Sequence, residues 1–207
     1  MTKLIDVSFL PEPDLNKAEE GWGYLNVKSK EVLESFEKIQ DIVNPKVVIE
    51  IGMFAGRSTL IMLEHFESLQ KLTSYDPNPI SLKAANEIQS RYPKFSFYNG
   101  PIWGNEDVHK DVDLIFIDGD HTPRSVLKDI KSCSIIRPKY VLFDNVEKSG
   151  VSAVIDRLRL YEERYNPTFF FYVDTHKGIV KPGILMLVNI TDSSWTGLRE
   201  RTASFNV

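Results

Sequence analysis

The stretch that decides the fold of this chain is Val47-Val-Ile-Glu-Ile-Gly-Met-Phe-Ala-Gly-Arg-Ser-Thr-Leu60. Its first five residues form an apolar run interrupted only by Glu50, and such β-branched runs are typical of a buried parallel strand. Gly52 and Gly56 follow, and glycine tolerates a sharp turn or a close backbone approach. Apolar residues then recur at helical spacing. The stretch therefore predicts a strand, a glycine turn and a helix whose unpaired N–H groups face a crevice.

The glycine spacing argues against two nucleotide-binding motifs. Dinucleotide-binding enzymes use Gly-x-Gly-x-x-Gly, whereas three residues separate Gly52 from Gly56. A P-loop requires Gly-Lys followed by Ser or Thr, and here Arg57 and Ser58 follow Gly56. A dinucleotide-dependent oxidoreductase is therefore disfavoured, and a P-loop NTPase is not indicated.

Four residues of the stretch, Glu50, Gly52, Gly56 and Ser58, resemble the first motif of class I S-adenosylmethionine-dependent methyltransferases. In that family the acidic residue and the glycines hold the methionine part of the cofactor. The resemblance therefore implies that these four residues bind the cofactor S-adenosylmethionine. The alternative that the motif leaves open is a tight strand-to-helix turn without a ligand.

Composition narrows the class of protein and its partners. The chain has 207 residues, 42% hydrophobic and 26% charged, which suits one globular α/β domain. The net charge is −4 without a long basic run, so nucleic acid is not an expected partner. The single Cys133 excludes an internal disulfide, and we expect a cytoplasmic protein. No apolar run approaches the ~20 residues of a membrane helix, and no signal-peptide pattern opens the sequence, so no membrane partner is expected.

Strand and helix patterns alternate along the rest of the chain. Helices are predicted at 29–43, from the glycine turn to about residue 70, at 81–91, after the fourth strand to 132, and from 151. Strands are predicted at 47–51, 71–76, 95–98, 112–118, 140–144, 169–173 and 183–188. A short loop containing His176 and Pro182 joins the last two strands, which should pair as a hairpin.

This alternation predicts an α/β fold with a seven-stranded, mostly parallel sheet and helices on both faces. The closing hairpin adds one antiparallel strand. The resemblance implies the same architecture, the Rossmann-like fold of class I methyltransferases. We expect one methyltransferase-like domain over 28–190. A lead-in at 1–27, a candidate active-site flap, precedes it, and a loosely held polar tail at 191–207 follows.

Two further segments are expected to complete the cofactor site. Asp76 ends the second strand 20 residues after Gly56, where a carboxylate can accept hydrogen bonds from a ribose diol. The alternative for Asp76 is a helix N-cap or a turn, since it opens the run Asp-Pro-Asn-Pro. In the methyltransferase interpretation, Ile102 or Trp103 lines the adenine slot. The alternative for Trp103 is ordinary packing.

Polar residues also follow the fourth and fifth strands. Asp118 ends the fourth strand, and Asp144 and Asn145 end the fifth. Neighbouring strands lie about 5 Å apart, so these side chains should meet at one edge of the sheet. Carboxylate and amide oxygens suit Mg²⁺ or Ca²⁺, whereas one cysteine and four scattered histidines give no zinc pattern. The three residues therefore predict a divalent-cation site. The alternative is a structural role for each aspartate, or contact of Asp118 with the cofactor.

The same residues sharpen the resemblance. Asp118 with Asp144-Asn145 is similar to the cation ligands of the catechol O-methyltransferase group and its relatives that methylate sugar or phenylpropanoid hydroxyls. The run Asp118-Gly-Asp-His121 also resembles small bacterial and phage methyltransferases. The catechol enzymes place a basic lysine where this chain has His121, and sugar-methylating relatives have a histidine nearby. The resemblance implies catalytic roles for His121 and Asp118. A capping or hydrogen-bonding role is the alternative for His121.

Together, the residues and the resemblance predict an S-adenosylmethionine-dependent methyltransferase acting on a hydroxyl of a small molecule, a sugar or a catechol-like diol, with Mg²⁺ or Ca²⁺. Two alternatives stay open. One is metal-independent methyl transfer to nitrogen or a carboxylate, and the other is a module that binds adenosylmethionine or a nucleotide without turnover. Fold analogy places Trp22, Tyr24, Lys148 and His176 near the acceptor. The outer hairpin is a common dimer surface, so a homodimer is among the expected states.

Overall fold

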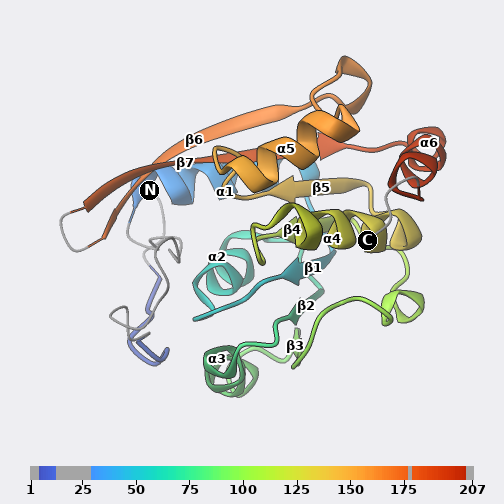
Figure 1. Ribbon diagram of the computed structural model, residues 1–207. Helices are drawn as coiled ribbons and strands as arrows, with labels where there is room; N and C mark the ends of the chain where they lie inside the picture. Colours follow the sequence, from blue (N-terminus) through green and yellow to red (C-terminus); the bar gives the residue numbers. More distant parts are fainter. Residues whose placement is uncertain (1–4, 13–28, 177–178, 204–207) are drawn as a thin grey trace.

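The computed structural model describes residues 5–12, 29–176 and 179–203, in which helices and strands alternate (Figure 1). The helices are α1 (Lys30–Val43), α2 (Arg57–His65), α3 (Pro79–Gln89), α4 (Pro123–Ile136), α5 (Ser149–Leu158) and α6 (Asp192–Ala203), with short 3₁₀ helices η1 (Glu106–Val108) and η2 (Glu163–Tyr165). The strands are β1 (Val47–Ile51), β2 (Lys71–Tyr75), β3 (Phe95–Tyr98), β4 (Leu114–Ile117), β5 (Tyr140–Phe143), β6 (Thr168–His176) and β7 (Ile179–Asn189). Within these residues, no helix is long and apolar enough to cross a bilayer.

The seven strands form one sheet in the order β3-β2-β1-β4-β5-β7-β6 (Figure 1). All pairs from β3 through β5 are parallel. β7 runs antiparallel to both of its neighbours, β5 and β6. The predicted seven-stranded sheet with a single antiparallel strand is therefore confirmed, and so is the α/β fold class.

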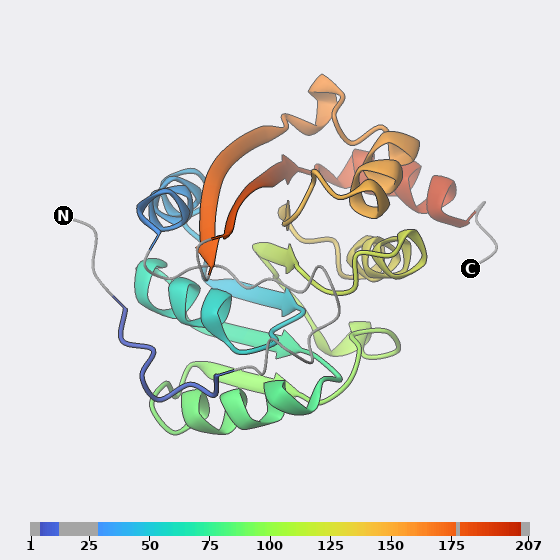
Figure 2. The same ribbon diagram turned by 60° about the vertical axis from the view of Figure 1, so that its left-hand side comes forward.

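Helices cover both faces of this sheet (Figure 2). One hydrophobic cluster packs α1, α2 and α3 on one face and includes Phe36 and Ile88. The other cluster packs α4, α5 and α6 on the opposite face and includes Ile130 and Trp195. Because water reaches neither face, every residue of β4 is buried. Burial on both faces explains why the central strands have continuous apolar sequences.

Local sequence sets where the helices begin. The Asn78 side chain accepts a hydrogen bond from the N–H of Ile80, and Pro79 fills the first helical position. Helix α3 therefore begins two residues before the predicted Ser81. Thr122 and Pro123 repeat this arrangement at the start of α4. Asn44 ends α1 in the left-handed conformation, at the predicted position.

Three other boundaries differ from the predictions. Helix α2 ends at His65 rather than near residue 70, because the backbone of Phe66 is extended (φ −85°, ψ 93°). The Phe66 side chain is buried although it lies beyond the helix. Helix α4 continues four residues beyond 132, to Ile136. Strands β6 and β7 pair as far as His176 and Ile179, so the hairpin is tighter than expected and Pro182 lies within a strand.

The prediction of a loosely held polar tail after residue 190 is wrong for the segment that forms α6. Trp195 and Leu198 on this helix are 1% and 0% exposed. The Trp195 indole N–H also donates a hydrogen bond to the carbonyl of Pro138 at 3.0 Å. Few large apolar residues mark the helix, so its sequence carries only a weak helical pattern.

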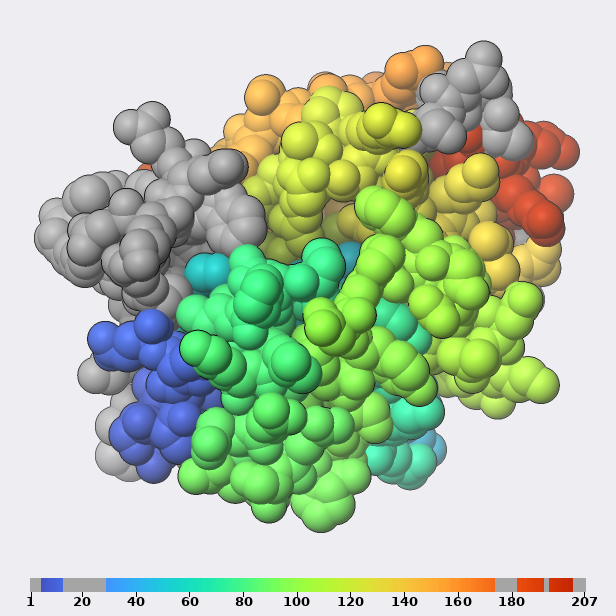
Figure 3. Space-filling model, turned by 60° about the horizontal axis from the view of Figure 1, so that its bottom comes forward, coloured from blue at the N-terminus to red at the C-terminus, as the bar shows by residue number. Residues whose placement is uncertain are grey.

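Part of the N-terminal lead-in packs on the domain. Residues 5–12 lie beside α3 on the face seen in Figure 3, with Ile5 and Leu10 buried. The Arg91 guanidinium lies 4.1 Å from the centre of the Phe9 ring. The predicted flap residues Trp22 and Tyr24 lie outside the residues that the structure describes.

Candidate active site

The glycine turn leaves β1 at the carboxyl edge of the sheet. Gly52 has φ +89° and Gly56 has φ +78°, conformations that other residues rarely adopt. A Cβ on Gly52 would lie 2.1 Å from the carbonyl oxygen of Asp118, and a Cβ on Gly56 would lie 2.8 Å from Cδ1 of Ile88. The turn therefore needs both glycines, and its backbone lies directly against the end of β4.

Glu50 supports this turn from within the domain. Its carboxyl group accepts hydrogen bonds from the hydroxyls of Ser58 at 2.5 Å, Thr59 at 2.6 Å and Ser74 at 2.5 Å. Burial raises the pKa of Glu50 to about 7. The side chain has no exposed surface. In this structure Glu50 and Ser58 bond to each other and tie β1, α2 and β2 together, and their contact with a cofactor stays a prediction.

Asp76 holds the same turn from the neighbouring strand. Its Oδ2 accepts hydrogen bonds from the backbone N–H groups of Met53 at 2.9 Å and Phe54 at 2.7 Å. Its Oδ1 accepts one from the N–H of Asn78 at 2.7 Å. An ionised carboxylate has about four acceptor positions, so capacity remains for a ribose hydroxyl. Asp76 is therefore a turn aspartate, and a ribose contact would be an additional role.

The loop after β3 carries the predicted adenine-site residues. Ile102 is fully buried, while Trp103 is partly exposed. The Trp103 indole N–H donates a hydrogen bond to Oδ1 of Asp129 at 2.8 Å, and the Lys128 ammonium lies 4.3 Å from the ring centre. The other carboxyl oxygen of Asp129, Oδ2, lies beside Gly119, 3.7 Å from where a Cβ on this glycine would be. Trp103 is thus held in place against α4.

Asp129 is a residue that the sequence analysis missed. It is 3% exposed, and burial raises the pKa of its carboxyl group to about 7. The available signal was an aspartate on the apolar face of α4, flanked by Val126 and Ile130. A buried acidic residue on such a face requires a partner, which here is Trp103.

Asp118 and Asp144 meet where β4 and β5 end, as predicted. The two residues follow paired positions at the ends of these neighbouring strands, Ile117 and Phe143. Burial raises the pKa of both groups well above the usual range, and the charge of Asp118 adds to this effect on Asp144. Oδ1 of Asp144 accepts hydrogen bonds from the Asn145 N–H and from the Tyr172 phenol, both at 2.7 Å. Sequence analysis missed Tyr172, because β6 reaches the site only through strand order.

His121 lies between Asp118 and Lys148. Its Nδ1 is 3.3 Å from the Lys148 ammonium, and its Nε2 is 3.6 Å from Oδ1 of Asp118. Burial lowers the pKa of His121, and the charge of Lys148 lowers it further. An ammonium group has only donors, so Nδ1 accepts and the ring hydrogen belongs on Nε2. Gly150 allows this packing, because a Cβ there would lie 1.9 Å from the His121 carbonyl oxygen.

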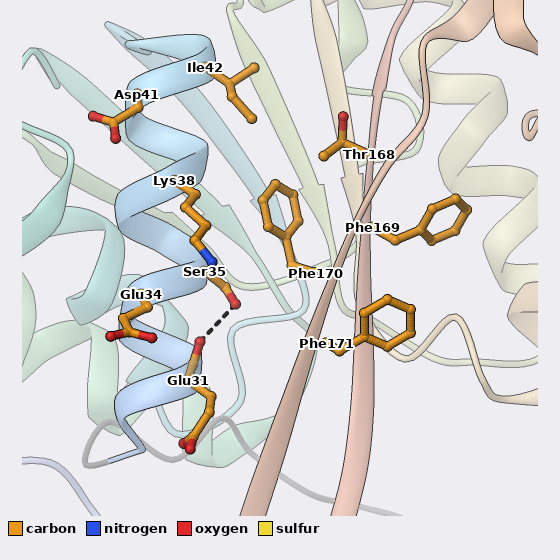
Figure 4. A pocket seen from close by; sticks show the side chains of 10 residues that line it. All are labelled: Glu31, Glu34, Ser35, Lys38, Asp41, Ile42, Thr168, Phe169, Phe170 and Phe171. Atoms are coloured by element: carbon orange, nitrogen blue, oxygen red, sulfur yellow. Dashed lines mark hydrogen bonds between the residues drawn. The ribbon is translucent and has the colours of Figure 1, made fainter.

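Two other predicted features lie outside this cluster. The backbone of His176 belongs to β6, and the structure does not describe its side chain. A hollow between α1 and β6 is lined by Glu31, Lys38 and Phe169, among others (Figure 4). None of the predicted site residues lines this hollow, which sets it apart from the residues gathered at the strand ends.

The metal prediction stands on two carboxylates and one amide. In the part of the chain that the structure describes, no group of three or more His, Cys, Asp or Glu side chains is arranged to hold a metal ion. The predicted set differs from such a group because its third member is Asn145. The Asn145 side-chain nitrogen lies 3.5 Å from both Oε1 of Glu147 and the Tyr172 hydroxyl.

Residues 49–145 match a protein-family model described as a methyltransferase domain. This segment contains the glycine turn, Asp76, Trp103 and both strand-end aspartates. No curated protein sequence matches the chain.

The family match covers slightly less than half of the chain, and solved methyltransferase structures share its fold. Two solved structures illustrate the likeness. An O-methyltransferase from Bacillus cereus, in complex with S-adenosylhomocysteine, has a TM-score of 0.60 and 16% identity over 78% of this chain and 81% of that one. The O-methyltransferase TomG from Streptomyces achromogenes, involved in tomaymycin synthesis and bound to S-adenosylmethionine, has a TM-score of 0.58 and 16% identity over 80% and 82%.

Proposed function

We propose that this protein transfers a methyl group from S-adenosylmethionine to a hydroxyl group of a small molecule, with a divalent cation held by Asp118, Asp144 and Asn145. The observation that carries the proposal is the contact between Gly52 and the Asp118 carbonyl. This contact places the glycine turn of the methyltransferase domain directly beside the acidic pair. A cofactor on the turn and an acceptor on the carboxyl groups would therefore be neighbours.

S-adenosylmethionine, when bound, supplies a methyl group on a positively charged sulfur. The chain supplies a shaped frame for it. Gly52 and Gly56 keep the turn free of side chains, and Asp76 fixes the Met53 and Phe54 N–H groups. The remaining acceptor capacity of Asp76 suits a ribose diol, and Trp103 walls the adenine side. The catalytic contribution of such a frame is mainly orientation.

The acidic pair fits a divalent cation by its donor chemistry. Two carboxylates side by side, one buried at Asp144 and one partly buried at Asp118, repel each other when both are ionised, so they favour a shared proton or a cation. Mg²⁺ and Ca²⁺ prefer oxygen ligands of this kind. Two donors already occupy Oδ1 of Asp144, which leaves Oδ2 for a ligand. A bound cation would supply a Lewis acid that eases deprotonation of an acceptor hydroxyl.

His121 is the candidate base, and its surroundings define how it would act. Its lowered pKa keeps the imidazole neutral near neutral pH. Nε2 carries the hydrogen on its Asp118 side, and Nδ1 accepts from Lys148. To take a proton from an acceptor hydroxyl, Nδ1 must exchange its Lys148 contact for the hydroxyl. The position of the Lys148 ammonium would then decide whether an acceptor hydroxyl can reach Nδ1 of His121.

The experiment that tests the proposal is isothermal titration calorimetry with S-adenosylhomocysteine, with and without Mg²⁺, on the wild type and Asp76→Ala. We expect binding that the substitution weakens at least about tenfold, since several hydrogen bonds are lost. Asp113→Ala is the matched control. Asp113 also accepts two backbone N–H bonds, from Lys46 and Val47, but at the opposite edge of the sheet. Absence of binding by the wild type would refute the proposed cofactor.

One observation favours a second candidate, a metal-independent methyltransferase. The positive charge of Lys148 already acts on Asp118 and lowers its pKa against the effect of burial. An internal ammonium could thus neutralise the acidic pair without a metal. Methyl transfer measured with and without a chelator separates the two candidates. Full activity in the chelator would support the metal-independent enzyme.

A further inference from the structure

Tyr172 reaches the acidic pair from an unexpected distance. It belongs to β6, the outermost strand, and β7 separates β6 from β5. Strands lie about 4.8 Å apart, so about 10 Å separate the backbones of β6 and β5. The Tyr172 phenol nevertheless donates a 2.7 Å hydrogen bond to Oδ1 of Asp144, the residue after β5. To make this bond, the side chain has to cross the intervening strand.

Gly183 makes that crossing possible. It pairs with Tyr172 across the hairpin. A Cβ on Gly183 would lie 2.1 Å from Cζ of the Tyr172 ring and 2.4 Å from its hydroxyl oxygen. Any other residue would therefore push the ring away. The backbone of Gly183 has no positive φ that would itself demand glycine, so the ring explains this glycine.

The two carboxyl oxygens of Asp144 differ in their hydrogen bonds. The Tyr172 phenol and the Asn145 N–H both point at Oδ1. Asp144 is 4% exposed and Tyr172 is 5% exposed, so water does not readily replace the phenol as a donor to this carboxyl group. With Oδ1 held, the carboxyl group cannot rotate freely, and Oδ2 keeps a fixed direction.

We infer that Tyr172 is a positioning residue, which crosses the notch at Gly183 to orient the Asp144 carboxylate toward a divalent cation. The inference rests on the proposed function, in which Asp144 is a cation ligand. Groups that hydrogen-bond to a ligating carboxylate typically contribute 10–100-fold to metal affinity. Tyr172 and Gly183 act as one unit, because the phenol reaches Asp144 only when position 183 has no side chain.

The test is Mg²⁺ titration calorimetry on four single variants, with saturating S-adenosylhomocysteine present. We expect Tyr172→Phe and Gly183→Ala each to weaken Mg²⁺ binding by about tenfold or more. The double variant should bind no more weakly than the weaker single variant, because the two substitutions break the same contact. Affinity for S-adenosylhomocysteine should stay within about twofold of the wild type. Gly183→Ala retains the phenol, so it tests the geometry without removing the group.

Two matched controls separate this role from packing. Tyr140→Phe removes a phenol at the far end of β5, where it bonds only weakly to Asn189 at 3.5 Å. Gly197→Ala adds a methyl group at a glycine with nothing within 4 Å. Both controls should bind Mg²⁺ as the wild type does.

Three outcomes would overturn the inference. Unchanged Mg²⁺ affinity in Tyr172→Phe and Gly183→Ala would do so while leaving the proposed function intact. A parallel loss of Mg²⁺ affinity, cofactor affinity and free energy of unfolding would show a merely structural role. A wild type that binds S-adenosylhomocysteine but no Mg²⁺ would refute the proposed cation site, and this inference with it. This third outcome is measured on the wild type, whereas the first two are measured on the variants, so the experiment distinguishes them.

Discussion

Gly52 is the residue at which the turn and β4 constrain each other most tightly. Gly52→Ala would place a Cβ 2.1 Å from the Asp118 carbonyl oxygen at a φ of +89°. We expect a loss of unfolding free energy that exceeds the ~1–3 kcal/mol of backbone strain alone. The displaced turn should also weaken S-adenosylhomocysteine binding at least about tenfold. Urea denaturation and calorimetry measure the two effects.

Gly104→Ala is the control for strain, because Gly104 has φ +86° and nothing within 4 Å of the Cβ position. This variant should show the strain without the clash. Equal losses of unfolding free energy in the two variants would contradict the importance of the Asp118 contact.

Asp129 should make stability depend on pH. Burial raises its pKa to about 7, against about 4 in an unfolded chain, so the folded protein holds the proton more tightly. Its contribution to the free energy of unfolding is complete below about pH 4 and is lost as the pH rises toward 7. Asp129→Asn cannot titrate and still accepts a bond from Trp103. Urea unfolding across this range should show a decline that is shallower by about 1–4 kcal/mol in the variant.

Asp129→Asn should not remove the whole pH dependence of stability, because Glu50 contributes to it as well. Burial also raises the pKa of Glu50 to about 7, so its contribution has the same sign and persists in Asp129→Asn. A residual decline is therefore expected. An Asp129→Asn variant with the wild-type slope would show that Asp129 titrates at an ordinary pKa when folded.

Site residues next to strand ends were predictable, and residues brought in by packing were not. Asp76, Asp118 and Asp144 each follow a strand, and parallel strands bring their carboxyl ends to one edge. Asp129 reaches the site from the middle of a helix, and Tyr172 reaches it across another strand. Sequence spacing carries no record of such tertiary contacts.

At the scale of elements, α6 depends on one anchoring side chain. Trp195 is 1% exposed and donates a hydrogen bond to Pro138. Trp195→Ala should therefore lower the free energy of unfolding by about 3–5 kcal/mol. Urea denaturation measures the loss. S-adenosylhomocysteine affinity should persist under native conditions, because α6 packs on α4 and α5 and carries none of the proposed cofactor-binding residues. A change below about 1 kcal/mol would mean that the helix docks without this residue.

The strands were predicted more accurately than the ends of the helices. Strand β1 was predicted at its exact bounds, since burial on both faces imposes an apolar run with sharp limits. The edge strand β3 was also predicted at its exact bounds, although it is only partly buried. The end of α2 was not, because Phe66 continues the apolar pattern after the helix has stopped. The hairpin was underestimated for a related reason. Its outer residues pair only with each other, beyond the end of β5.

At the scale of the whole molecule, the proposed cofactor-binding residues belong to one seven-stranded sheet and its turns, so a ligand bound to them should stabilise the entire domain. S-adenosylhomocysteine at one hundred times its dissociation constant should raise the free energy of unfolding by about 2.7 kcal/mol. Thermal unfolding with increasing ligand measures this effect. Asp76→Ala should require more ligand for the same shift. A melting temperature that is independent of ligand concentration would contradict binding to the folded state.

The position of Tyr172 in the chain has a consequence for how the protein is made. The glycine turn, Asp76, Asp118 and Asp144 all precede residue 146, whereas Tyr172 and Gly183 come from the hairpin that is synthesised later. Synthesis proceeds from the N-terminus, so a growing polypeptide contains both aspartates before it contains the phenol and its notch. The acidic pair is completed only when the last strand of the sheet leaves the ribosome. A chain released before Gly183 would lack the hydrogen bond from Tyr172 to Asp144, so the proposed cation site would lack its orienting phenol.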